Sequence, residues 1–385
     1  MENISPNSPN SPSPNERETS ENIFTPRIYS WQEVPTPKPM RWIAKGSLPR
    51  GQLSCLVGDE GIGKSTFWLW LASLITTGES CEEYGIRKKK PLTVVAAPTE
   101  EDWADILKPR LEVAGVDKNY FKFFGIGSDG EAPPTFPAHI GQLEDGLNKL
   151  QDEGHEIGLV VVDPWQATLP LGGQIKDTAF ARHVIIPWKR IAQTFNTAVL
   201  LVNHANRNNS ASARDNHGGT IVLRQTARAS LYAIRDDEDG TLLIGPDKSN
   251  NGPMIPASRF AIEPARWHEP TADDDGMRPR LKLLNQEDRT INEILEDKAE
   301  ENKQANRLSR FGQTKQNVLD YVNKHEETTP KDVAEALGID NKTASKHLNE
   351  LARSSLIDQL ERGMFSPLPL SQDESEIGEN GENNN

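Results

Sequence analysis

Residues 58–66 of this 385-residue chain have the types and spacing of a loop that binds phosphate. The segment GDEGIGKST fits the pattern GxxxxGK[ST] and lies between an apolar run at 53–57 and a helix-like segment at 66–75. Glycines let the backbone turn its N–H groups toward an anion, and the helix that follows directs its positive N-terminal end at the same charge. The pattern predicts nucleotide binding; the alternative is a glycine-rich turn without a ligand.

The expected nucleotide contacts are Gly58, Asp59, Glu60, Gly61, Ile62, Gly63, Lys64, Ser65 and Thr66. Lys64 is placed to reach the β- and γ-phosphates of ATP, and the Ser65 hydroxyl is placed to bind Mg²⁺. Asp163 directly follows the apolar run 159–162, as in a buried strand that presents one carboxylate to the same Mg²⁺. The alternative for Asp163 is an ordinary aspartate at the end of a strand.

Three further carboxylates, Glu100, Glu101 and Asp102, follow a second apolar run at 92–97. Hydrolysis of a nucleotide needs a base for the attacking water, and one of these side chains could supply it. A solvated acidic loop that precedes a helix explains at least two of the three, because the positive end of the helix favours acids.

Composition limits the class of protein. The net charge of −14 argues against a protein that coats duplex DNA with its whole surface. Residues 1–28 are rich in Ser, Pro and Asn, so we expect them to be disordered. The chain shows neither a signal peptide nor an apolar run that could span a membrane, which predicts a cytoplasmic protein with no membrane contact. Cys55 and Cys81 lack the spacing of a metal or redox site and are expected to be reduced structural residues.

Apolar runs alternate with amphipathic stretches across 29–268, the pattern of a parallel sheet covered by helices on both faces. The expected strands are 53–57, 92–97, 121–126, 159–162 and 198–202. The expected helices are 64–75, 103–114, 140–152 and 176–194. An antiparallel hairpin is expected over 229–235 and 241–244. The charged stretch 269–306 is expected to be a linker with a solvated helix over 291–305.

A second pattern begins at 307 and ends at 367. Three short amphipathic helices and a small hairpin are predicted there, the second helix starting with a capping box and proline at 329–332. This arrangement is a winged helix-turn-helix. Residues 368–385 are polar and acidic, and we expect them to be disordered. The prediction is therefore an α/β domain followed by a small C-terminal winged helix.

Several segments in order resemble the RecA-like ATPases of the RepA-type hexameric replicative helicase family. They are LPRGQLSCLVGDEGIGKST, TEEDWADILKPRL, LVVVDPW, AVLLVNHANR, GGTIVLRQTARASLYAI and DKSNNG, and they span about residues 40–265. The resemblance implies a RecA-like P-loop fold whose mostly parallel sheet ends in antiparallel strands. It also implies a homo-oligomeric ring, expected to be a hexamer, with ATP bound between subunits.

The resemblance also assigns roles by position. Glu100 matches the catalytic glutamate, and His204 matches the polar residue that senses the γ-phosphate, with a histidine that merely caps a strand as its alternative. Arg228, or less directly Arg224, matches the arginine donated to the ATP of a neighbouring subunit; the alternative is that Arg228 pairs with a carboxylate at the sheet edge. Lys248 is a possible second contact of this kind.

DNA contacts are expected in two places. Loops 169–177 and 205–219, the second with Arg207 and Arg214, should face the ring channel and bind single-stranded DNA through its phosphates, unless they are ordinary disordered loops. The third helix expected in the winged-helix region places basic and polar side chains on one side. Duplex DNA binding is therefore preferred there over a protein contact. Acidic and basic residues are nevertheless equal in number in this region, about nine of each. The side chains expected to contact that DNA are Lys342, Thr343, Lys346, Asn349 and Arg353.

These expectations favour a Mg²⁺-dependent ATPase that forms a ring and acts as a DNA helicase or translocase in the replication of a phage, plasmid or mobile element. A second hypothesis is an ATP-regulated replication initiator or regulator that binds DNA through its winged helix. A recombinase is a third hypothesis, disfavoured because the segments match the helicase branch better.

Overall fold

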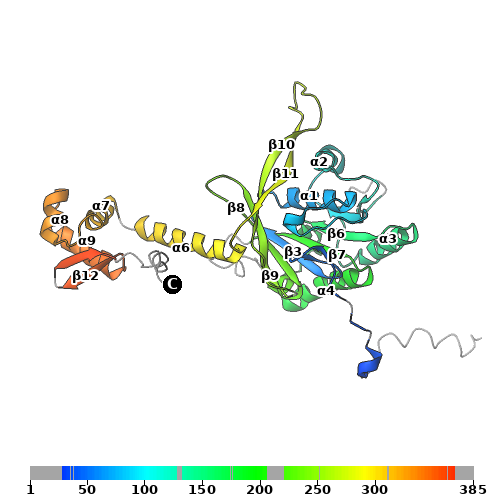
Figure 1. Ribbon diagram of the computed structural model, residues 1–385, viewed down its shortest axis with the longest axis horizontal. Helices are drawn as coiled ribbons and strands as arrows, with labels where there is room; N and C mark the ends of the chain where they lie inside the picture. The colour runs from blue at the N-terminus through cyan, green and yellow to red at the C-terminus, as the bar shows by residue number, and fades with distance from the viewer. Residues whose placement is uncertain are drawn as a thin grey trace, which may run out of the picture. The chain divides into compact units, whose positions relative to one another are not determined.

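The computed structural model describes residues 28–368 of the chain except 35, 38, 128–131, 174, 176, 206–220, 251, 310–311 and 362. The chain divides into two compact units, Met1–Arg41 and Trp42–Asn385. The described part of the first unit holds a single 3₁₀ turn, η2 (Trp31–Glu33), and the second unit holds the sheets and the longer helices (Figure 1). Among the described residues, no helix is both long and apolar enough to cross a bilayer.

A nine-stranded sheet forms the centre of the second unit, in the order β11-β10-β9-β8-β3-β7-β6-β4-β5. The parallel strands are β3 (Leu53–Gly58), β4 (Thr93–Pro98), β5 (Phe121–Phe123), β6 (Ile157–Asp163), β7 (Ala198–His204) and β8 (Ala229–Arg235). The antiparallel strands are β9 (Leu242–Ser249), β10 (Ser258–Arg266) and β11 (Met277–Gln286). This confirms the predicted α/β fold, a mostly parallel sheet that ends in antiparallel strands.

Helices cover both faces of the sheet, as Figure 1 shows. One face packs against α1 (Lys64–Thr77) and α2 (Lys108–Ala114), and the other against α3 (Ile140–Asp152), α4 (Thr178–Thr194) and α5 (Ile221–Thr226). Strand β7 contributes Leu200 and Val202 to the first core and Val199 and Leu201 to the second. A strand buried on both faces must be apolar at every position, which is why these strands read as continuous apolar runs. The remaining short elements are β1 (Trp42–Ala44), β2 (Leu48–Pro49), η3 (Glu82–Tyr84) and η5 (Trp165–Thr168).

The helix expected over 103–114 consists of two parts. A π-helical turn, η4 (Trp103–Leu107), comes first and α2 follows it. The Asp102 carboxylate accepts a hydrogen bond from the Asp105 N–H at 2.6 Å and caps the turn. Pro109 has no N–H to donate and is favoured in the first turn of an α-helix, which is where α2 places it.

The stretch 269–306 differs from the expected linker. It supplies strand β11, which pairs with β10 along its whole length. It also supplies most of α6 (Ile291–Ser309), whose first turn buries Ile291, Ile294 and Leu295 in the sheet core. The sheet therefore continues past residue 268, and only the later part of α6 leaves the core.

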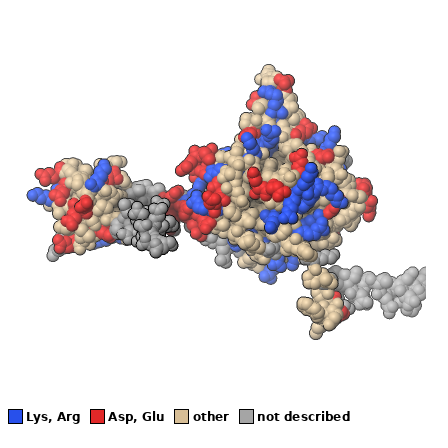
Figure 2. Space-filling model, in the orientation of Figure 1, with Lys and Arg blue, Asp and Glu red and all other residues tan. Residues whose placement is uncertain are grey.

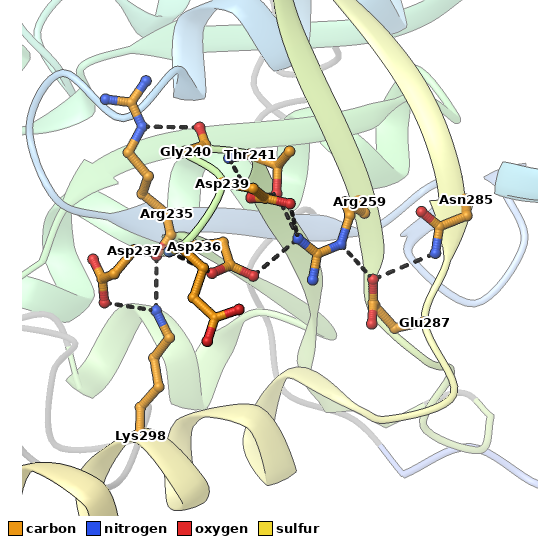
Figure 3. Close-up of polar contacts among 11 residues, drawn as sticks. Arg235, Asp236, Asp237, Asp239, Gly240, Thr241, Arg259, Asn285, Glu287 and Lys298 are labelled. Carbon is orange, nitrogen blue, oxygen red and sulfur yellow. Dashed lines mark hydrogen bonds and ion pairs between the residues drawn. The ribbon is translucent and has the colours of Figure 1, made fainter.

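Ion pairs fix this extension to the β8–β9 hairpin (Figure 3). The Arg259 guanidinium on β10 contacts Asp236 and Asp239 of the hairpin turn, each at 2.9 Å. It also contacts Glu287, just after β11, at 2.7 Å. Since one guanidinium donates to carboxylates from both hairpins, the antiparallel strands form one rigid extension of the sheet.

Residues 312–368 form a separate small core. The elements are α7 (Gln313–Val322), α8 (Pro330–Leu337), α9 (Asn341–Arg353), β12 (Ile357–Glu361) and β13 (Met364–Pro367). Thr329 and Asp332 form the expected capping box at the start of α8. Val318, Leu348 and Phe365 are among the buried residues that hold the helices against the β12–β13 wing. The winged helix-turn-helix prediction is confirmed.

Candidate nucleotide-binding site

The phosphate loop connects β3 to α1. Gly63, the N-cap of α1, has φ of 110°, a conformation that favours glycine. A Cβ on Gly58 would lie 2.6 Å from the Ala233 carbonyl oxygen of the neighbouring strand, so the loop can leave the sheet here only with glycine. The backbone N–H groups at the start of α1 are thereby free to meet an anion.

Lys64 lies inside this loop. Its side chain is buried, and its Nζ donates hydrogen bonds to the carbonyl oxygens of Gly58 at 2.9 Å and of Asp59 at 2.5 Å. Burial lowers the pKa of the Lys64 ammonium, an effect that the nearby carboxylates, Asp163 first, oppose. The ammonium is held at the phosphate position by acceptors that a more strongly charged ligand can replace.

Two oxygens meet at the expected metal position. The Ser65 hydroxyl at the start of α1 donates to Asp163 Oδ2 at the end of β6, with 2.7 Å between the oxygens. Carboxylate and hydroxyl oxygens are the hard ligands that Mg²⁺ binds. Among the described residues, no group of three or more His, Cys, Asp and Glu could hold a metal ion. The Ser65 and Asp163 oxygens would hold Mg²⁺ together with water and nucleotide phosphates.

The three carboxylates after β4 have different partners. Glu101 forms an ion pair with Arg110 of α2, and Asp102 caps η4. Glu100 is exposed, lines the same cavity as Lys64, and makes no hydrogen bond or ion pair with a described residue. Of the three, only Glu100 is therefore available to a ligand, which supports its choice as the catalytic base.

His204 contacts both the phosphate loop and the segment that follows β6. It ends β7 opposite Gly58, and its Nδ1 lies 3.5 Å from Lys64 Nζ. Its backbone N–H donates to the Gln166 side-chain oxygen at 3.1 Å, and Gln166 belongs to η5, which follows Asp163. His204 and Gln166 thus link the phosphate loop to the segments that follow β6 and β7.

A cavity of about 620 Å³ unites these groups. Its walls include Lys64, Ser65, Glu100, Asp163 and His204, so the structure brings the predicted catalytic and metal residues, apart from Arg228, together around one space. This volume lies within the range of small-molecule sites, roughly 300–1,000 Å³.

The cavity also has walls that the sequence analysis missed. Arg110 donates to the Thr66 hydroxyl at 3.1 Å, and Arg278 and Pro279 of β11 close one side. The Arg278 guanidinium lies 5.1 Å from the centre of the Trp267 ring and pairs with Asp274 at 2.6 Å. Arg110 could have been noted as a cation on the helix that follows the acidic loop 100–102, and β11 could have been noted from the alternation of apolar and charged residues over 277–283.

The predicted intersubunit residues lie at the other end of the sheet. The Arg228 N–H donates to the carbonyl oxygen of Leu53, the first residue of β3, whereas the phosphate loop follows the last residue of that strand. The length of β3, about 3.3 Å per residue, therefore separates Arg228 from its own phosphate loop. Arg228 is exposed, and its side chain forms no ion pair with any described carboxylate, contrary to the alternative of a pair at the sheet edge.

The other two candidates for intersubunit contacts are engaged within the subunit. Arg224 pairs with the fully buried Asp247 carboxylate at 2.7 Å. Lys248 donates to the carbonyl oxygens of Arg224, Gln225 and Ala227, which closes the end of α5. Both side chains have structural roles, so Arg228 is the better placed of the three for a neighbouring subunit.

The candidate DNA contacts differ in accessibility. Lys342, Lys346 and Arg353 of α9 are exposed. Thr343 donates to the Asp340 cap at 2.6 Å, and Asn349 donates to the Ser345 carbonyl oxygen at 2.7 Å, so both are partly buried and engaged within their own helix. Three of the five predicted DNA contacts are therefore exposed, and the other two are partly buried.

Arg207 and Arg214 lie outside the described residues, as do Gln174 and Lys176 of the first loop. Figure 2 shows Lys and Arg side chains in separate groups among the acidic ones, without one basic face in this view. Any attraction for DNA phosphates on this face must therefore be local.

The fold and the site define a class: an α/β domain with the phosphate loop of P-loop ATPases, followed by a helix-turn-helix domain. The AAA domain family matches residues 24–210, and the helix-turn-helix domain family matches residues 314–359. No curated protein matches the chain. A solved structure whose title describes it as an ATPase domain is 12% identical and covers 62% of this chain and 86% of its own, with a TM-score of 0.42, a likeness too low to inform on single residues.

Proposed function

We propose that this chain is an ATP hydrolase that assembles into a ring, expected to be a hexamer, and moves along single-stranded DNA as a helicase or translocase. One observation carries the proposal. The binding residues Lys64, Ser65 and Asp163 line one cavity, whereas Arg228 lies exposed at the opposite end of β3. An exposed arginine in that place can complete only the site of another subunit, as a ring of identical heterologous contacts allows.

The residues divide the work of hydrolysis. The loop N–H groups and Lys64 hold the phosphates, and Ser65 and Asp163 would hold Mg²⁺, which when bound neutralises charge on the β- and γ-phosphate oxygens. Glu100 accepts a proton from the attacking water. The Arg228 fork of the neighbour stabilises charge on the γ-phosphate in the transition state. His204 and Gln166 transmit the state of the phosphates to the loops after β6 and β7.

Mixing two inactive variants tests the shared site. Lys64→Ala removes the phosphate contact and Arg228→Ala removes the donated arginine, so each protein alone should lose ATP turnover. In a ring formed from equal amounts of both, about a quarter of the interfaces combine an intact Lys64 with an intact Arg228. The mixture should therefore regain ATPase activity after co-refolding. If the mixture stays inactive although each variant assembles like the wild type, Arg228 does not act between subunits.

A second candidate function rests on the exposed Lys342, Lys346 and Arg353 of the helix-turn-helix domain. In this hypothesis the chain is a replication initiator or regulator whose ATPase controls assembly on duplex DNA. The DNA that stimulates ATP turnover distinguishes the two. Stimulation by any single strand, kept after removal of residues from 307 onward, supports the helicase in replication of a phage, plasmid or mobile element. Stimulation by one duplex sequence supports the initiator.

A further inference from the structure

A buried tryptophan contacts the carboxylate expected at the metal site. Trp68 lies one helical turn after Ser65 on α1, and its side chain is 1% exposed. Its indole Nε1 donates to Asp163 Oδ2 at 2.6 Å, the same oxygen that accepts from Ser65 at 2.7 Å. Side chains three positions apart on a helix share one face, so α1 presents both donors to Asp163 together.

The contact is specific to this indole. Trp165 and Trp188 are equally buried, yet their indole Nε1 atoms have no hydrogen-bond partner within the described structure. Burial of a tryptophan in this fold therefore does not by itself bring an acceptor to its N–H. The Trp68 ring is further held by Phe121 of β5, with ring centres 6.4 Å apart and planes 11° apart. The N–H direction is thus fixed by packing.

The chemistry of an indole suits this position. The indole N–H only donates a hydrogen bond, so it cannot accept a proton and cannot replace a carboxylate as a metal ligand. A hydrogen bond to a charged acceptor is about twice as strong as a neutral one. Both donors meet Asp163 Oδ2, and Oδ1 makes no hydrogen bond to a described residue. Two donors on one oxygen fix the plane of the carboxylate and leave the other oxygen available at the cavity.

We propose that Trp68 is a positioning residue for the metal site: it holds the Asp163 carboxylate in the orientation that accepts Mg²⁺ with the nucleotide. The inference rests on the proposed ATP hydrolase. The Ser65 oxygen can bind the cation through a lone pair while its proton stays on Asp163, and the indole N–H is the second donor that fixes the carboxylate. Partners of this kind set metal affinity by roughly 10- to 100-fold when they are removed.

The test compares Trp68→Phe with Trp188→Phe in the full chain. Both changes shorten a buried indole to a phenyl ring, but only the first removes an N–H that has an acceptor. The measurement is the Mg²⁺ concentration that gives half-maximal binding of a fluorescent ATP analogue. We expect Trp68→Phe to raise it by about 10-fold or more, while Trp188→Phe leaves it unchanged. At saturating Mg²⁺ both variants should bind the analogue like the wild type.

The outcomes separate this inference from the proposed function. If the wild type binds no nucleotide, the proposed function fails. If the wild type binds it with Mg²⁺ and Trp68→Phe shows an unchanged Mg²⁺ requirement, the role of Trp68 is overturned and the function stands. An equal loss in both variants would mean that core packing, not the hydrogen bond, is responsible, which also overturns the role.

A measurement on the unmutated chain applies even if Trp68→Phe does not fold. The eight tryptophans can be labelled as 5-fluorotryptophan and observed by ¹⁹F NMR with a non-hydrolysable ATP analogue. Addition of Mg²⁺ to the nucleotide-bound protein should shift one buried signal, because the acceptor of that indole then also binds the cation. The absence of any Mg²⁺-dependent shift would overturn the inference.

Discussion

Replacing Glu100 by glutamine tests the catalytic base with little change in shape. Glutamine keeps the size of the side chain and removes the carboxylate that would accept a proton from water. General base catalysis contributes about 10²- to 10⁴-fold, which corresponds to roughly 2.7–5.4 kcal/mol of activation free energy. Because Glu100 is exposed and has no partner among the described residues, the change should cost almost no stability. The expected result is a loss of at least about 100-fold in kcat with nucleotide binding retained.

Glu101→Gln is the matched control, since it neutralises the adjacent carboxylate. That change weakens the ion pair with Arg110, in which the Arg110 and Glu101 side chains are 11% and 31% exposed. A partly exposed pair of this kind contributes on the order of 1 kcal/mol to stability and nothing directly to proton transfer. The assay is phosphate release at saturating Mg²⁺ and ATP, beside equilibrium binding of an ATP analogue. Normal turnover in Glu100→Gln, or an equal loss in Glu101→Gln, would refute the assignment.

Three further predictions concern the C-terminal strands. Arg278→Ala should weaken ATP binding several-fold but leave binding of inorganic tripolyphosphate unchanged, because Arg278 lines the cavity from β11 and does not belong to the phosphate loop; equal losses would place it on the phosphates instead. Arg224→Ala should lower the free energy of unfolding in urea by about 3 kcal/mol, since it removes the guanidinium from the fully buried Asp247 carboxylate; a change under about 1 kcal/mol would contradict this. The pKa of His268 is raised by its hydrogen bond to the Glu269 carbonyl oxygen and then by Asp274. The contribution of His268 to stability is therefore present below the unfolded pKa of about 6.5 and is lost as the pH rises through the folded pKa. His268→Gln should remove this part of the dependence of Tm on pH, and an unchanged profile would count against it.

The sequence predicted the parallel part of the sheet because its strands are buried on both faces. Such strands are uninterrupted apolar runs, and the phosphate loop fixed the position of β3 and α1 among them. Strand β11 escaped prediction for the opposite reason. Of its ten residues only Leu281 is buried, and Pro279 interrupts the alternation of apolar and charged residues in the sequence MRPRLKLLNQ. A hairpin that extends beyond the helices has little core to pack against, and a charged stretch that contains proline has the composition of a linker.

Some residues of the candidate site could be predicted from the sequence and others could not. Lys64, Ser65 and Asp163 were predictable because phosphate and metal chemistry demand those residue types at the ends of strands. Trp68 was not, since a tryptophan on an apolar helix has the pattern of a core residue, and only the structure shows where its N–H points. Gln166 was also missed, because a contact between the loops after two strands depends on which strands are neighbours. Side-chain direction and strand order are properties of the folded chain, not of local spacing.

The direction of the strands gives the proposed mechanism its intersubunit character. Strands β3 and β8 run parallel, so the start of β8 must lie beside the start of β3 and away from the loop that follows its end. Arg228 occupies that start, and Ala233, near the end of β8, pairs with Gly58. A residue before a parallel strand cannot reach a site after the neighbouring strand without spanning the length of that strand. Within one subunit the fold therefore separates the charge that binds the phosphates from the arginine proposed to stabilise their transfer, and only contact with a second subunit can bring the two together.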